Sequence, residues 1–101
     1  MVKHLVMFKL ADEADGRVKK ENALIIKNKL EALKNVIPEI RKITVYINDE
    51  NADSDNFDIV LDSEFDTLDD VKKYSNHSEH LKVAAFIGKV RTDRAAIDYE
   101  F

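Results

Sequence analysis

The order in which the hydrophobic period changes along the chain constrains its fold more than any other feature. Residues 2–10 alternate between two sides, Val2, His4, Val6, Phe8 and Leu10 on one and Lys3, Leu5, Met7 and Lys9 on the other, and this period with β-branched and aromatic residues is typical of a strand. Residues 17–37 then repeat apolar side chains at intervals of three and four, which predicts one stripe of an amphipathic helix. Pro38 disfavours helical geometry at Ile37 and predicts that this helix ends there.

The second half of the chain repeats the pattern with an extra strand. Residues 40–47 and 57–65 predict two strands, and residues 94–101 predict a last one. Between them, a short helix is expected after Thr67 as its N-cap, and another over residues 78–90. The order βαββαβ indicates an α+β, ferredoxin-like fold: a four-stranded antiparallel sheet with helices on one face, the second helix being broken in two.

Length and composition exclude several classes of protein. A chain of 101 residues predicts a single domain, residues 1–101. The absence of cysteine excludes disulfides and thiolate chemistry, and a start interrupted by lysines is no signal peptide, so we expect a cytoplasmic protein. A net charge of −4 without a basic run argues against a nucleic-acid partner, and no segment approaches the roughly 20 apolar residues of a membrane span.

The strand patterns also predict what lies on each face of the sheet. The face under the helices is expected to hold His4, Val6, Phe8, Phe57, Ile59, Leu61, Ile97, Tyr99 and Phe101. The open face is expected to have an apolar centre of Leu5, Met7, Val60 and Ala96, with a rim of Lys3, Lys9, Asp58, Asp62, Glu64, Asp98 and Glu100. Such a face is either solvated or a contact between two copies of the chain with an apolar middle and a charged rim.

Four segments carry a resemblance to a known family. The opening VKHLVMFKL, the helix end VIPEI, the segment YSNHSEH and the closing AIDYEF together resemble the stress-responsive α/β-barrel family. The resemblance covers nearly the whole chain and implies a homodimer in which two ferredoxin-like sheets pair into a dimeric α/β barrel. One departure is Ser78, which stands where the family usually has proline. Serine still caps a following helix, so the fold is not threatened.

The segment YSNHSEH also contains the candidate site residues. The family includes a plant polyketide (olivetolic acid) cyclase, which closes a ring by aldol chemistry without a metal or other cofactor. Its acid–base tyrosine and histidine match Tyr74 and His80. A histidine of its first strand matches His4, and an aspartate of its last strand matches Asp98. By its phase in the first strand, His4 should face the helices, and we expect it to be buried with a polar partner.

We expect any pocket to lie between the helix-facing side of the sheet and the helix break near residue 76. Its apolar lining is predicted to include Phe8, Ile59, Leu81 and Phe86. In this interpretation His80 is the base, Tyr74 donates a hydrogen bond, and His77 serves the start of the following helix. The expected ligand is a neutral or anionic carbonyl compound with an aromatic or aliphatic tail.

Several functions remain open at this point. The first is binding of a small carbonyl or aromatic compound with no assigned reaction. The second is a metal-independent, aldol-type cyclase or lyase that uses a tyrosine–histidine acid–base pair. The third is a non-catalytic, stress-linked structural oligomer, in which His80 simply packs the first turn of its helix. Other dimeric ferredoxin-like barrels are monooxygenases or isomerases, but no residue marks that chemistry here.

Two patterns imitate metal sites. Residues 49–55 place acids and an asparagine at every second position, like a calcium loop, but Ser54 and Val60 stand where glycine and glutamate are needed. His77 and His80 lie three residues apart, but a metal would need a third ligand. Some members of the family hold magnesium with backbone oxygens near the position of Val36, which leaves no side-chain signature. We therefore predict no metal and no cofactor.

Overall fold

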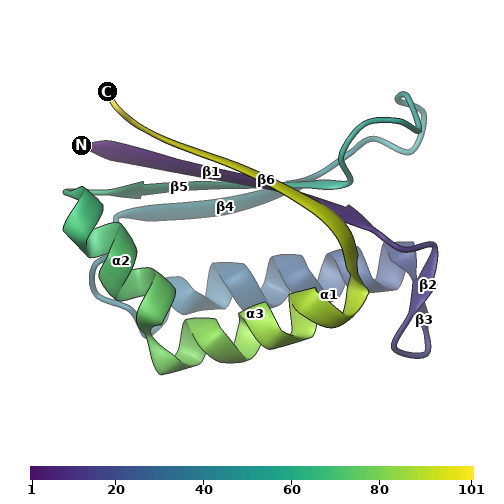
Figure 1. Cartoon of the computed structure of the whole chain (residues 1–101), viewed down its shortest axis with the longest axis horizontal. Helices are drawn as coiled ribbons and strands as arrows, with labels where there is room; N and C mark the ends of the chain where they lie inside the picture. The colour runs from purple at the N-terminus through teal and green to yellow at the C-terminus, as the bar shows by residue number, and fades with distance from the viewer.

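The computed structural model describes all of residues 1–101, and it forms one antiparallel sheet with every long helix on the same side (Figure 1). Its elements in chain order are β1 (Val2–Leu10), β2 (Glu13–Ala14), β3 (Arg17–Val18), α1 (Lys19–Ala32), the 3-10 helix η1 (Leu33–Asn35), β4 (Lys42–Ile47), β5 (Ile59–Phe65), α2 (Leu68–Asn76), α3 (Ser78–Val90) and β6 (Arg91–Glu100). The predicted ferredoxin-like order is confirmed, and a small hairpin, β2–β3, is added in the loop before α1.

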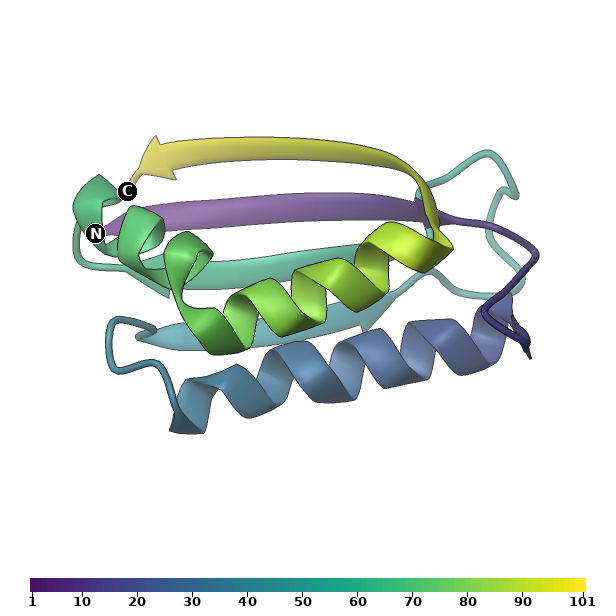
Figure 2. The same ribbon diagram turned by 60° about the horizontal axis from the view of Figure 1, so that its bottom comes forward.

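The sheet has the order β4-β5-β1-β6, so the first strand of the chain lies in its middle. Both neighbours of β1 are antiparallel to it, with His4 opposite Ser63 on one side and Asp98 on the other. Figure 2 shows β4 and β6 as the two edges, with α1 and α3 running along the covered face. This topology is the one predicted from the alternation of strands and helices.

The apolar stripe along one side of α1 explains why this helix forms and which side of it packs against the sheet. Ala23, Ile26 and Leu30 are buried against the sheet, and Leu33 continues the stripe into η1. Nineteen buried apolar residues form one core cluster between sheet and helices. No helix is both long enough and apolar enough to cross a bilayer.

Side-chain caps begin both α2 and α3, and the second cap lies at the break between them. Thr67 Oγ1 accepts a hydrogen bond from the backbone N–H of Asp70 at 3.1 Å, which begins α2 as predicted. His77 adopts an extended conformation, and its Nδ1 accepts from the N–H of Glu79 at 3.1 Å. The expectation that His77 serves the start of the second helix is therefore confirmed, with Ser78 as the first helical residue.

The predicted faces of β6 are wrong. Since directly opposed residues point to the same face, pairing of His4 with Asp98 places Asp98 on the helix-covered side. Ile97 pairs with Leu5 and Tyr99 with Lys3, so both lie on the open face. Ala96 and Glu100 lie on the same side of the sheet as Asp98. Phe101, which lies beyond the end of the strand, is exposed. Alternation indicates which residues share a face, but the register with β1 decides which face that is.

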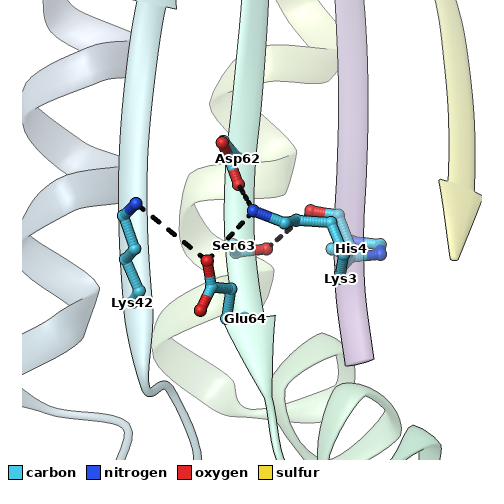
Figure 3. Close-up of polar contacts among 6 residues, drawn as sticks. All are labelled: Lys3, His4, Lys42, Asp62, Ser63 and Glu64. Carbon is cyan, nitrogen blue, oxygen red and sulfur yellow. Dashed lines mark hydrogen bonds and ion pairs between the residues drawn. The ribbon is translucent and has the colours of Figure 1, made fainter. Parts of the chain in front are cut away.

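The open face carries a charged ladder beside its apolar residues (Figure 3). Lys3 on β1 reaches across to β5, where its Nζ lies 2.9 Å from Asp62 and 3.0 Å from Glu64. Lys42 on β4 approaches Glu64 from the other side at 4.0 Å. The hydrogen bonds to Asp62 and Glu64 raise the pKa of Lys3, so this lysine stays charged. Lys3 thus pairs with two acids of the predicted open-face rim, Asp62 and Glu64, whereas Asp98 and Glu100 of that rim lie on the covered face.

Candidate functional site

A cavity of about 140 Å³ lies between the sheet and α3, beside the break between α2 and α3. It is lined by His4, Val6, Phe8, Leu30, Leu61, Ser75, His80, Ala84, Ile87, Arg91 and Arg94. Six of these residues are hydrophobic, and the polar ones come from three different elements and the end of α2. An apolar space with a few convergent polar groups is the usual form of a small-molecule site.

Tyr74 does not itself line this cavity and is completely buried, but it packs against His80, which does line it. Its ring packs on the imidazole of His80, with centroids 4.5 Å apart, and on Phe65 at 5.2 Å. The hydroxyl oxygen Oη has no hydrogen-bond partner within the protein, although it is shielded from solvent. Burial raises the pKa of Tyr74, so the phenol keeps its proton and can donate a hydrogen bond.

His80 presents the complementary group. Its Nδ1 lies 2.9 Å from the carbonyl oxygen of Ser75, and because a carbonyl only accepts, Nδ1 carries the hydrogen. In the neutral ring Nε2 is then the acceptor, and it has no partner within the protein. Burial lowers the pKa of His80, an effect that the bond to Ser75 opposes and the nearby charges of His4 and Arg94 reinforce. His80 is therefore neutral at neutral pH and able to accept a proton at Nε2.

His4 is held from two sides. Its side chain is 9% exposed, and Nδ1 is hydrogen-bonded to Oδ1 of Asp98. Ser63 Oγ donates to the backbone oxygen of His4 at 2.8 Å and fixes the strand at this point (Figure 3). The ring of His4 is 6.1 Å from that of Tyr74 in an edge-on arrangement. The prediction that His4 is buried with a polar partner is confirmed.

The expected apolar lining is only partly brought together. Phe8 lines the cavity with His4, but Ile59, Leu81 and Phe86 do not. Ile59 pairs with both Phe8 and Ile47 and fills the core on the β4 side. Leu81 is 53% exposed on the outer face of α3.

Phe86 lies outside the cavity lining. It packs at the margin of the core, and Lys29 of α1 lies over its ring with Nζ 5.7 Å from the centroid. The positions of Leu81 and Phe86 show that the apolar stripe of a helix also includes residues that face its neighbour or solvent.

Sequence reasoning missed Arg91 and Arg94, which both line the cavity. The missing signal was the register of β6, which decides which of its residues face the helices. Ser75 was also missed, because it takes part through its backbone oxygen, which any residue type supplies. Leu30 and Ile87 were recognisable as apolar stripe residues of their helices.

A larger hollow of about 490 Å³ lies on the open face of the sheet, under the loop that joins β4 and β5. Figure 1 shows this loop rising on the side of the sheet opposite the helices. Its walls include Met7, Tyr46, Phe57 and Val60, but none of the histidines. It belongs to the exposed apolar surface rather than to the site around His80. Nowhere do three or more His, Asp or Glu side chains gather as metal ligands would.

Several proteins of known structure are similar to this chain. A dimeric protein of unknown function and ferredoxin-like fold from Bacteroides fragilis is 40% identical, with 99% of this chain and 95% of that chain covered and a TM-score of 0.79. A dimeric ferredoxin-like protein from Thermobifida fusca is 22% identical over 99% and 90% of the two chains, with a TM-score of 0.82. A hydroxynitrile lyase from Passiflora edulis is 16% identical over 97% and 90%, with a TM-score of 0.76.

At the identities of the Thermobifida and Passiflora proteins, the likeness shows the fold alone. No relative was found among curated proteins. The model of the stress responsive A/B barrel domain matches residues 2–101, which is nearly the whole chain. This chain therefore belongs to the stress responsive A/B barrel domain family.

Proposed function

We propose that this protein is a homodimer that binds a small carbonyl or aromatic compound in the cavity beside α3. The observation that carries the proposal is the pairing of Tyr74 and His80. A protonated phenol, which can donate a hydrogen bond, lies against an imidazole whose Nε2 can only accept, and neither the phenol oxygen nor Nε2 has a hydrogen-bond partner within the protein. A carbonyl compound that has hydrogens on the carbon next to the carbonyl suits both groups, because its oxygen accepts a hydrogen bond from Tyr74 and those hydrogens are acidic enough to face a base.

The energy of an unpaired buried group supports this interpretation. A buried hydroxyl without a partner costs about 1–3 kcal/mol, so such a group is kept where something compensates for it. A bound carbonyl oxygen that accepts from Tyr74 supplies that compensation. The apolar wall of Val6, Phe8, Leu61 and Ile87 supports an aromatic or aliphatic tail.

The homodimer is supported by the open face and by the dimeric Bacteroides fragilis relative. Tyr46, Ile97, Tyr99 and Phe101 are each more than two-fifths exposed, although they are large and apolar or aromatic. A contiguous exposed apolar surface on a small domain is typical of a contact with another protein. Packing two such faces together forms the barrel for which the family is named.

Acid–base catalysis is the second candidate, and the protonation of the same pair favours it. His80 Nε2 would remove a proton from the carbon next to the carbonyl, and Tyr74 would donate a hydrogen bond to the developing enolate oxygen. The Passiflora edulis lyase shares the fold, so the fold accommodates an enzyme. The enolate would then be the nucleophile of an aldol-type reaction, as expected of a cyclase.

The test uses acetophenone, an aromatic ketone with exchangeable methyl hydrogens. Binding is followed by NMR on the labelled protein, and we expect shift changes at Ser75, His80 and Ala84. His80→Ala should abolish binding with little change in stability. His77→Ala is the matched control: it should keep binding and lose about 1 kcal/mol of stability, because it removes an N-cap. Unchanged binding in His80→Ala, or shift changes away from the cavity, would contradict the proposal.

The same sample separates binding from catalysis. In deuterated water, a base at His80 should accelerate exchange of the methyl hydrogens of acetophenone, and His80→Ala should remove the acceleration. Binding without exchange supports the binding function and argues against the acid–base function. Exchange that survives in His80→Ala would rule out His80 as the base.

A further inference from the structure

The pairing of β1 with β6 contains an irregularity that shapes one wall of the cavity. Phe8 pairs with Arg94 and Lys9 with Asp93, but Leu10 pairs with Arg91, so the register shifts between Lys9 and Leu10. Residues three apart on a regular strand point to opposite faces. Because the bulge adds one residue to β6, Arg94 lies opposite Phe8 and Arg91 lies opposite Leu10, and both of these β1 residues face the helices. Both arginines therefore point to the covered side, where they line the cavity.

The charge of this wall differs from that of the rest of the molecule. The chain has 20 acidic and 16 basic residues. The residues lining the cavity nevertheless include two arginines and not one aspartate or glutamate. Of the acids nearby, Asp98 is bonded to His4, and Asp93 accepts the backbone N–H of Arg94. The cavity is thus a cationic site in an anionic protein.

The four arginines of the chain divide into two pairs. Arg17 lies 3.2 Å from Asp15, and Arg41 lies 2.6 Å from Asp66, both away from the cavity. Arg91 and Arg94 have no carboxylate within ion-pair distance. Both are exposed, which places their charges at the mouth of the cavity, while its apolar residues lie further inside. The arginines that lack an internal partner are the ones that face the cavity.

We propose that Arg91 and Arg94 make the cavity selective for compounds that combine an apolar body with a carboxylate. The inference rests on the proposed binding function and names its class of ligand. A planar guanidinium matches the geometry of a carboxylate and binds it with charge-assisted hydrogen bonds. The carboxylate is held at the mouth, and the apolar body extends along Phe8, Leu61 and Ile87 toward His80. The effect of Arg94 on the pKa of His80 agrees with this proximity.

The experiment compares benzoate with benzamide, which has the same shape and no charge. Each is titrated into the wild-type protein, and dissociation constants are taken from NMR shift changes at His80 and Ala84. We expect benzoate to bind about tenfold or more tightly than benzamide, which corresponds to a charge-assisted hydrogen bond. Arg91→Gln and Arg94→Gln should each reduce this preference, and Arg94→Lys should retain part of it. Arg41→Gln, which alters an arginine outside the cavity, should leave it unchanged.

The outcomes separate this inference from the proposed function. If benzamide and benzoate bind equally, or if the glutamine variants keep the preference, the inference is wrong while binding in the cavity stands. If acetophenone, benzamide and benzoate all leave the cavity residues unshifted, both the inference and the proposed function are wrong. A preference for benzoate that falls in both glutamine variants and persists in Arg41→Gln supports the inference.

Discussion

The two faces of the sheet are built from alternate residues of the same strands, yet they are completed in different ways. On the covered face, the helices bury Val6, Leu61 and Phe65 until none is more than 2% exposed. On the open face, Met7 is 38% exposed and Ile97 59%, and no part of the chain covers them. The covered face is therefore completed within one chain, whereas the open face is suited to contact with a second copy.

The covered face is itself uneven. Toward β4 it is filled by Ile26, Ile37 and Val45, which are completely buried. Toward β6 it contains the cavity, the unpaired hydroxyl of Tyr74 and the two arginines. The densely packed part stabilises the fold, and the looser part holds the groups that could act on a ligand. Binding sites commonly retain such imperfect packing at a cost in stability.

The largest expected effect comes from truncating neighbours on opposite faces. Ile59→Ala removes a side chain that is 2% exposed on the covered face and should lower the free energy of unfolding by about 3 kcal/mol. Val60→Ala, one residue further and on the open face, should cost less than about 1.5 kcal/mol. Urea denaturation measures both. Equal losses would show that the two faces are not distinguished as described.

A charge on the open face should break the dimer without unfolding the chain. Met7→Lys places an unpaired ammonium in the middle of the proposed contact. We expect the dissociation constant of the dimer to rise by about a hundredfold or more, which corresponds to about 3 kcal/mol. Sedimentation velocity at micromolar concentration measures it. Leu81→Lys is the control, since Leu81 is a similarly exposed apolar residue on α3. A wild-type protein that sediments as a monomer would refute the dimer.

Removing the unpaired hydroxyl should stabilise the protein. Tyr74→Phe deletes a buried oxygen that has no partner, so the free energy of unfolding of the unliganded protein should rise by about 1 kcal/mol, while acetophenone binding weakens. Tyr99→Phe removes a hydroxyl from a residue that is 42% exposed and should change neither quantity. A loss of stability in Tyr74→Phe would show that the hydroxyl already has a partner in solution.

The smallest effect is a pH dependence from the covered face. Because burial lowers the pKa of His80 below its ordinary value of 6.5, the unfolded chain binds a proton more readily than the folded one. The contribution of His80 to stability should therefore fall as the pH drops through about 6.5 toward the lower folded pKa. The expected result is a smaller loss in His80→Gln than in the wild type between about pH 7 and about pH 5.5, measured by urea denaturation. An equal loss would contradict the lowered pKa.

The sequence was sufficient for the element order, the helix break and the position of His4. Each depends on local chemistry: the change of period, the caps at Thr67 and His77, and the phase of β1. The faces of β6 were not predictable from local chemistry, because β6 is an edge strand whose apolar residues lie on the open face. The rule that apolar residues face the helices fails where a second apolar surface exists.

The candidate site shows the same division. Tyr74 and His80 were found through a resemblance and lie together, as an i to i+6 spacing across a helix break allows. Arg91 and Arg94 were not found, because their common orientation depends on a bulge set by the pairing of two strands far apart in sequence. A pattern along one strand does not reveal an irregularity that arises between two.

The central place of β1 has a consequence for how the chain reaches its structure. His4 and Ser63, its neighbour on β5, are 59 positions apart, and His4 and Asp98 on β6 are 94 apart. Closing such long loops costs entropy before any contact stabilises them, which slows folding relative to a helical domain of the same length. During synthesis β1 leaves the ribosome well before β6, with which it pairs. Until β6 is made, the edge of β1 that pairs with it remains a row of unpaired backbone groups open to wrong partners, and such exposed edges favour aggregation.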